Sequence, residues 1–212
     1  MSCKIKLYHQ TNFLKIVSMK RIFLTSLFLL LFTTINSQKT ASGYYMNQSN
    51  DTIAAEIKIG KGVFGQMSTN FTDEVYIKDS LNNFKKFSPS DIKSYGFEYE
   101  GKKYIFFSKP TKKGENKFLV PMYLGNKGSL YQYGNFIAGN GYALPSQQVF
   151  YTFEKPNEEY LFLRNILNKK FKIQIKEFYS EHLETQELID KKLQYWLDLN
   201  KDLIEIMQSI NK

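Results

Sequence analysis

The chain has 212 residues, of which 42% are hydrophobic, and it is long enough to bury one ordinary core without disulfide bonds. Its formal net charge of +9 would suggest a nucleic-acid partner, but residues 1–37 hold five of the 29 basic residues and none of the 20 acidic ones. The remainder has 24 basic against 20 acidic residues, a net charge of only +4, so we expect no nucleic-acid partner. The single cysteine, Cys3, lies in the same leading segment, which excludes thiol catalysis and cysteine metal ligands from the rest of the chain.

A basic and then apolar segment near the start predicts a secretory signal peptide over residues 19–37. Met19-Lys20-Arg21 is followed by apolar residues 22–32 and by a small-residue exit that ends at Ser37. The apolar run is shorter than the roughly 20 residues that a membrane span requires, although an uncleaved anchor is the alternative. We therefore expect an exported protein, periplasmic or extracellular and associated with the cell envelope, with no transmembrane segment after cleavage. Residues 1–18 are then a leader extension, or translation starts at Met19.

From residue 38 to residue 153 the sequence predicts a β-rich domain. Thr52–Ile59 alternates apolar and polar residues, which is typical of a half-buried strand with an inner face made of Ile53, Ala55, Ile57 and Ile59. A shorter strand is expected at Glu74–Lys78, hairpins at 97–107 and 117–133, and a last strand at Gln147–Phe153. The glycine-rich segments Gly60–Gly65 and Gly134–Ser146 are expected to be loops.

The carboxy-terminal residues 154–212 predict amphipathic helices that pack on the sheet and form one folding unit with it. Lys155–Glu159 contains a proline, an asparagine and two acidic residues, which is typical of a helix start, and Thr185–Leu188 resembles a second cap that leads to Trp196. A stripe of apolar residues at helical spacing follows, made of Leu199, Leu203, Ile206 and Ile210. This stripe packs either on the chain's own sheet or its 158–179 helix, or on another chain. The predicted fold class is α+β, an antiparallel sheet or small β-barrel followed by these helices.

Four segments of the β-rich part form a set with a familiar pattern. They are Gly43-Tyr44-Tyr45, Asp51-Thr52-Ile53, Ser88–Phe97 and Phe118–Tyr131. The set resembles a family of proteins exported by Bacteroidota for which no activity is established, and the likeness covers most of residues 43–210. Asn50 and Ala55 depart from the family pattern, which has glycine at both positions. The resemblance implies a shared fold and export, and it implies no catalytic residue.

The sequence predicts no catalytic, cofactor-binding or metal-binding residue. The one histidine after residue 38, His182, is interpreted as a solvated residue or a local helix cap. Glu98 and Glu100 share a strand face and flank a hairpin turn, so we interpret them as exposed acids rather than as a glycosidase pair; Asp73/Glu74 and Glu158/Glu159 are further acid pairs. Tyr131 and Tyr133 would place two rings on one strand face, where aromatic residues serve packing more commonly than sugar stacking.

We expect a non-catalytic exported domain that binds a protein or another component of the cell envelope, such as a glycan, through its sheet edge or its amphipathic tail. A carboxylate-dependent envelope hydrolase of the glycosidase type and a carbohydrate-binding module are the alternatives. No cofactor is expected. Two acids placed in a cleft would favour the hydrolase, and exposed coplanar tyrosines would favour the carbohydrate-binding module.

Cleavage of the signal peptide is expected between Ser37 and Gln38. Ile35 and Ser37 suit the two recognition positions before the cleaved bond, and polar residues begin there. Amino-terminal sequencing or the intact mass of the exported protein measures the cleavage position. A mature product that still contains Phe23–Phe32 would contradict this prediction.

Overall fold

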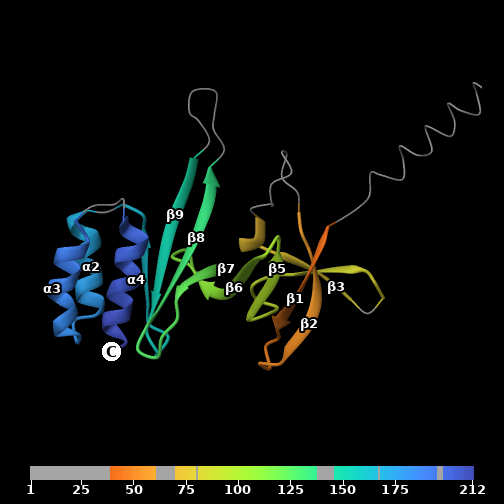
Figure 1. The fold of residues 1–212 in the computed structure, drawn as a ribbon, viewed down its shortest axis with the longest axis horizontal. Coiled ribbons are helices and arrows are strands. Elements are labelled where there is room, and N and C mark those ends of the chain that lie inside the picture. The colour runs from red at the N-terminus through yellow and green to blue at the C-terminus, as the bar shows by residue number, and fades with distance from the viewer. Residues whose placement is uncertain (1–38, 61–69, 80, 138–145, 167, 195–197) are drawn as a thin grey trace, which may run out of the picture. The chain divides into compact units, whose positions relative to one another are not determined.

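Ten antiparallel strands and three helices make up the part of the chain that the computed structural model describes, residues 39–60, 70–79, 81–137, 146–166, 168–194 and 198–212 (Figure 1). The strands form one open sheet in the order β10-β9-β8-β7-β6-β5-β1-β2-β3-β4, and the helices follow the strands in the sequence. The predicted α+β class is confirmed. The prediction allowed an antiparallel sheet or a small β-barrel, and the strands form an open antiparallel sheet.

The elements fall into three groups along the chain. The first group contains β1 (Thr40–Met46), β2 (Thr52–Lys58), a short 3-10 helix η1 (Asn70–Thr72), β3 (Val75–Lys78) and β4 (Phe84–Phe87). The second contains β5 (Ser94–Tyr99), β6 (Lys102–Pro110), β7 (Asn116–Tyr123), β8 (Ser129–Ile137), β9 (Ser146–Glu154) and β10 (Tyr160–Arg164). The third contains the helices α2 (Lys169–Phe178), α3 (Leu183–Lys192) and α4 (Leu199–Ile210).

Two antiparallel meanders, β1–β4 and β5–β10, are joined by the pairing of β1 with β5. Residues Gly43–Met46 of β1 lie opposite Ser94–Phe97 of β5. The two strands approach closely, because a Cβ atom added to Gly43 would lie only 2.2 Å from the carbonyl oxygen of Gly96. Only glycine therefore fits at this position of β1.

The strands that alternation and turn residues predicted are present. β2, β3 and β9 match the expected single strands, and β5–β6 and β7–β8 match the expected hairpins. In the β5–β6 turn, Glu100 and Gly101 have φ values of 51° and 73°. Positive φ at both central residues is what the commonest two-residue hairpin turn requires.

β7 changes partners along its length. From Asn116 to Leu119 it pairs with β6, and from Val120 to Tyr123 it pairs with β8, with a register irregularity after Pro121. Proline has no backbone N–H to donate and is found in sheets mainly at edges and irregularities. The change separates two main cores, one within β1–β7 and one between β8–β10 and the helices.

α2 and α4 pack against one face of the β7–β10 part of the sheet, and α3 packs against these two helices (Figure 1). α2 begins after Asn168, whose side-chain oxygen accepts a hydrogen bond from the backbone N–H of Phe171 at 2.9 Å. The predicted apolar stripe lies on α4, and its four residues are at most 2% exposed within the core beneath the helices. The stripe therefore packs on the chain's own strands and helices, and the alternative of packing on another chain is wrong.

The helix start predicted at Lys155–Glu159 is wrong, because these residues form the turn between β9 and β10. Glu158 has a φ of 60°, and the backbone N–H of Lys155 donates to the carbonyl oxygen of Glu159 at 2.9 Å. β10 follows, with Leu161 and Leu163 packed against the helical core. The helical part of the chain thus begins at Lys169 rather than at residue 154.

The start of α3 and the length of the loop between β8 and β9 also differ from the prediction. α3 begins after His182, so Thr185 lies inside that helix, where it is 1% exposed and its hydroxyl is 3.3 Å from that of Ser209. β8 extends through Ile137 and β9 begins at Ser146, which shortens the loop predicted at Gly134–Ser146. The rest of that loop, residues 61–65 of the other predicted loop and Trp196 lie outside the described residues.

The inner face predicted for β2 is only partly buried. Ile57 and Ile59 are 0% and 4% exposed, whereas Ile53, at the same parity on the strand, is 38% exposed. The prediction that Ile53 lies in the core is therefore wrong. The reason is that β3 lies opposite β2 at Ile57 and does not continue beside Ile53.

Replacement of Ile57 and of Ile53 by alanine applies the same chemical change at the two ends of one strand face. Ile57→Ala should lower the free energy of unfolding by about 2–5 kcal/mol, as expected for a fully buried aliphatic side chain. Ile53→Ala should lower it by less than about 1 kcal/mol, because much of this side chain is already in water. Denaturant unfolding measures both values, and equal losses would contradict the burial described for β2.

Candidate functional site

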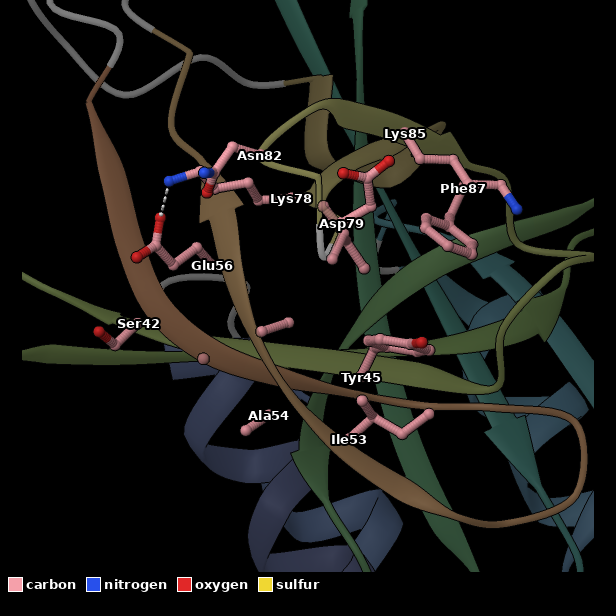
Figure 2. A pocket seen from close by; sticks show the side chains of 13 residues that line it. Ser42, Tyr45, Ile53, Ala54, Glu56, Lys78, Asp79, Asn82, Lys85 and Phe87 are labelled. Carbon is pink, nitrogen blue, oxygen red and sulfur yellow. Dashed lines mark hydrogen bonds and ion pairs between the residues drawn. The ribbon is translucent and has the colours of Figure 1, made fainter.

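A half-open hollow of about 850 Å³ lies between β2 and the β3–β4 hairpin. Its size is within the range of ligand pockets, about 300–1,000 Å³. Figure 2 shows the side chains of Tyr45, Ile53 and Phe87 grouped together, with the joined pair Glu56 and Lys78 apart from them. The complete lining is Ser42, Gly43, Tyr45, Ile53, Ala54, Ala55, Glu56, Ile77, Lys78, Asp79, Asn82, Lys85 and Phe87.

The hollow exists because β2 and β3 pair at a single position. β2 pairs with β1 from Thr52 to Lys58, along its whole length, but β3 meets it only where Ile57 lies opposite Ile77. β3 ends at Lys78, and the chain then turns back into β4. The edge of β2 that faces the hairpin therefore has no strand partner from Thr52 to Ala55 within the part of the chain that the structure describes.

Hydrogen bonds within a tight turn stabilise the β3–β4 hairpin. One carboxylate oxygen of Asp79 accepts hydrogen bonds from the backbone N–H groups of Leu81 at 2.9 Å and Asn83 at 2.8 Å, and Asn82 has a φ of 63°. Aspartate and asparagine favour such turns because their side chains bond to nearby backbone groups and tolerate left-handed conformations. All four residues of β3 pair with β4, and because the turn follows directly after Lys78, β3 does not continue along β2.

Aromatic and aliphatic side chains form one wall of the hollow. The ring centres of Tyr45 and Phe87 lie 5.5 Å apart, and both side chains are half-buried against the core of β1–β7. Ile77 is buried, at 3% exposed, while Ile53 is 38% exposed. A concave surface that exposes an aliphatic side chain beside aromatic rings is typical of a binding site.

Four charged side chains border the hollow, and three of them are bound within the protein. Glu56 and Lys78 form an ion pair at 3.0 Å, and Asp79 holds the hairpin turn. The Lys85 ammonium lies 5.1 Å from the centre of the Phe87 ring and forms no ion pair with the described residues. The pKa of Asp91 is lowered chiefly by hydrogen bonds from Ser88 and more weakly by Lys85. Lys85 is therefore the charge on this rim that remains available to a bound molecule.

The acid pairs considered from the sequence do not line the hollow. Glu98 lies opposite Lys103 at the exposed end of β5, and Glu100 occupies the β5–β6 turn. Of the other four acids, Glu158 lies in the β9–β10 turn, and the remaining three form the ion pairs Asp73–Lys117, Glu74–Lys86 and Glu159–Lys155. The structure thus brings none of the three pairs together over this concave surface.

Tyr131 and Tyr133 share a strand face, as predicted, but they do not form a surface for stacking on a sugar. They are 3% and 7% exposed and pack with Leu119 in a small third core. His182 precedes α3 but makes no side-chain hydrogen bond that caps the helix, and its ring lies 3.9 Å from a carboxylate oxygen of Glu181. Neither the tyrosine pair nor the histidine contributes to the hollow.

A largely buried polar cluster links β6 to β9 and β10 on the face that carries Tyr131. The Lys109 and Glu154 side chains form an ion pair and are 20% and 14% exposed. The Tyr160 hydroxyl donates to the same carboxylate at 3.0 Å, and the Lys109 ammonium lies 5.2 Å from the centre of the Tyr131 ring. Because the charges of the cluster are paired with each other, it serves as a contact between strands and leaves no charge for a ligand.

The binding function is inferred from the hollow, because the other structural observations and the comparisons identify neither a cofactor nor a relative. Within the described residues, no group of three or more His, Cys, Asp or Glu side chains is placed to hold a metal ion. No helix in the same ranges combines the length and the apolar character needed to cross a membrane. Comparison of the chain with protein-family models, with curated proteins and with solved structures finds no match.

The hollow was not expected from the sequence. Alternation of apolar and polar residues indicates the face of the strand on which a side chain lies, and it does not indicate which other elements cover that face. The pattern in Thr52–Ile59 predicted a covered face along the whole strand. A usable signal was length, since the strand expected at Glu74–Lys78 is shorter than Thr52–Ile59. A long strand beside a short one leaves part of its edge and face without a neighbour.

Alkaline titration should reveal the buried tyrosines. Burial raises the pKa of Tyr151 to about 12 and raises those of Tyr95, Tyr131 and Tyr179 as well. The folded state therefore holds these protons more tightly than the unfolded state, in which tyrosine titrates near pH 10. Their contribution to stability is present below about pH 10 and is lost as the pH rises through the folded-state values. Tyrosinate absorbance from these residues should appear together with unfolding followed by circular dichroism; complete tyrosine ionisation in a folded protein would contradict this.

Proposed function

We propose that this protein is an exported, non-catalytic domain of the cell envelope and that its hollow binds a polypeptide segment of another envelope component. The basic and apolar segment at residues 19–37 supports export. The resemblance to exported proteins of Bacteroidota supports the same destination. The choice of a polypeptide as ligand is supported by the hollow beside β2.

The exposure of Ile53 within a concave surface is the observation that carries the proposal. Ile57, on the same face of the same strand, is fully buried, whereas Ile53 is 38% exposed beside Tyr45 in the lining. Covering apolar surface is favourable by roughly 25 cal/mol per Å². A segment with apolar side chains would therefore gain binding free energy by covering Ile53 and the two rings.

A polypeptide suits the hollow better than the substrate of a carboxylate-dependent hydrolase. The two acids on the rim are engaged, Glu56 by Lys78 and Asp79 by the backbone of its own turn. Glycoside hydrolysis requires one carboxyl group as an acid and a second as a base or nucleophile. The rings of Tyr45 and Phe87 are tilted by 32° to each other, with their centres 5.5 Å apart, rather than presenting a flat platform for a sugar. No observation favours the hydrolase or the carbohydrate-binding module.

Selection of short random peptides on the purified protein tests the proposal. The wild type is the target and Ile53→Lys is the counter-target, because a charge there would oppose apolar contacts in the hollow. Val120→Lys is the matched control, since Val120 is 42% exposed on β7 and lies outside the lining. Selected peptides should bind the wild type and the control equally and Ile53→Lys at least about tenfold more weakly, a difference of about 1.4 kcal/mol.

Calorimetric titration measures the affinities, and denaturant unfolding establishes that all three proteins are folded. A selection that enriches no peptide would contradict the proposal. Peptides that bind the wild type, the control and Ile53→Lys with equal affinity would contradict it as well, because they would bind elsewhere.

A further inference from the structure

We infer that the bound segment is an extended strand that pairs with the open edge of β2 and places a carboxylate beside Lys85. This inference rests on the proposed function of the hollow and adds the mode of binding and the chemistry of the partner. The partner is a polypeptide with apolar residues at alternate positions and an acidic side chain on the same side as those residues. Addition of a strand to an exposed sheet edge is a common way in which proteins recognise extended peptides.

The edge of β2 supplies unused main-chain hydrogen-bonding groups. In an antiparallel sheet the N–H and C=O groups of a strand point alternately to its two neighbours. From Thr52 to Ala55 the groups that point away from β1 have no partner in the ladder with β3 and none among the turn and loop hydrogen bonds of the described residues. A strand of about four residues, at roughly 3.3 Å per residue, would pair with them.

This edge also lacks the residues that usually prevent strand addition. Exposed edges of natural sheets commonly carry lysine or proline or are very short. β4, at one end of the sheet, is short and has Lys85 and Lys86 among its four residues. In contrast, the residues Thr52-Ile53-Ala54-Ala55 of β2 carry no charge. The uncharged edge is thus suited to pairing, and it lies at the hollow.

The two faces of an added strand would meet different surfaces. Successive side chains of a strand point to opposite faces of the sheet. One face of the hollow has Tyr45, Ile53 and Phe87, and the other has Ala54 and the Glu56–Lys78 ion pair (Figure 2). A segment in which apolar residues alternate with polar residues would match both faces.

Lys85 supplies the charge complementarity. In the β3–β4 hairpin it lies opposite Ile77, two residues before Phe87, so it shares the face of the apolar wall. Its ammonium forms no ion pair with the described residues, while the other three charges of the lining are bound. An aspartate or glutamate on the apolar face of the added strand would pair with it.

The β3–β4 hairpin opposite β2 favours a single peptide segment, rather than a second copy of this chain, as the ligand at the β2 edge. A second β2 strand would bring its own β1 neighbour, since the two pair along their whole length. Neighbouring strands lie about 4.8 Å apart, so that β1 strand would lie about 10 Å from β2, on the side where Asp79, Asn82 and Phe87 line the hollow. One isolated strand meets no such obstacle.

Backbone methylation of a selected peptide tests the strand addition. An N-methyl group removes one N–H donor and leaves the side chain unchanged. In a peptide paired with β2, methylation at every second residue should weaken binding at least about tenfold, because it removes a main-chain hydrogen bond and adds a clash at the pairing edge. Methylation at the intervening residues, whose N–H groups point away from β2, should change the affinity by less than about twofold.

The outcomes separate the binding mode from the proposed function. Peptides that depend on Ile53 but show no alternation in the methylation series would overturn the strand addition and retain the hollow as a binding site. Failure to select any peptide would overturn both. Self-association of the protein without peptide, measured by ultracentrifugation and lost in Ile53→Lys, would identify a second copy as the occupant and overturn the inference.

The same peptides test the contact with Lys85. Lys85→Glu should weaken a peptide that carries the acidic residue about fivefold, and replacement of that residue by lysine should restore binding to the variant. Lys86→Glu is the matched control, because Lys86 is the next residue of β4 and points to the opposite face. Selected peptides without an acidic residue, or with equal affinity for the wild type and Lys85→Glu, would overturn this part of the inference.

Discussion

The pairing of β1 with β5 is the contact on which the rest of the sheet depends. β1 precedes β2 in the chain but lies between β2 and β5 in the sheet, so it holds the two meanders together. The absence of side chains at Gly43 and Gly96 permits this close pairing, and a Cβ atom added to Gly96 would lie only 2.9 Å from the Tyr44 ring. Beyond the paired residues, the backbone N–H of Lys93 donates to the carbonyl oxygen of Met46 at 2.9 Å. Loss of this pairing would leave β1–β4 as a small separate meander with a much smaller core.

The same pairing makes the hollow a preformed site. Tyr45 lies opposite Tyr95, which is fully buried and stacks on Phe106 with the ring centres 4.8 Å apart. The apolar wall is thus attached to the core of β1–β7, while the facing hairpin is held by its own turn and its own ladder. A ligand that enters such a site pays little for ordering the protein, so more of the contact free energy appears as affinity.

The sequence predicts this fold well where polar and apolar residues alternate, and poorly where they do not. Thr52–Ile59 alternates and forms β2, whereas Tyr160–Arg164 is almost entirely apolar, so its period could not distinguish a strand from a helix. The apolar stripe of α4 was predictable because helical periodicity is local to the chain. For the hollow the sequence offered only the unequal lengths of two strands, because the cover of Ile53 depends on where a distant strand, β3, stops pairing with β2. Turn residues at Asp79–Asn83 could indicate a hairpin but not the direction in which it leaves the sheet.

The order of the elements determines when the apolar face of β8–β10 is protected. The core beneath the helices combines strand residues such as Leu130 and Phe153 with Leu203 and Ile206 of α4, all of which are 0% exposed. α4 follows every strand that it covers in the sequence. In a chain that is synthesised amino-terminus first, those strands emerge before the helix that shields them, and during that interval aggregation and chaperone capture compete with folding. The arrival of α4 ends the interval, so the speed with which this helix follows the strands governs how much of the chain reaches its folded state.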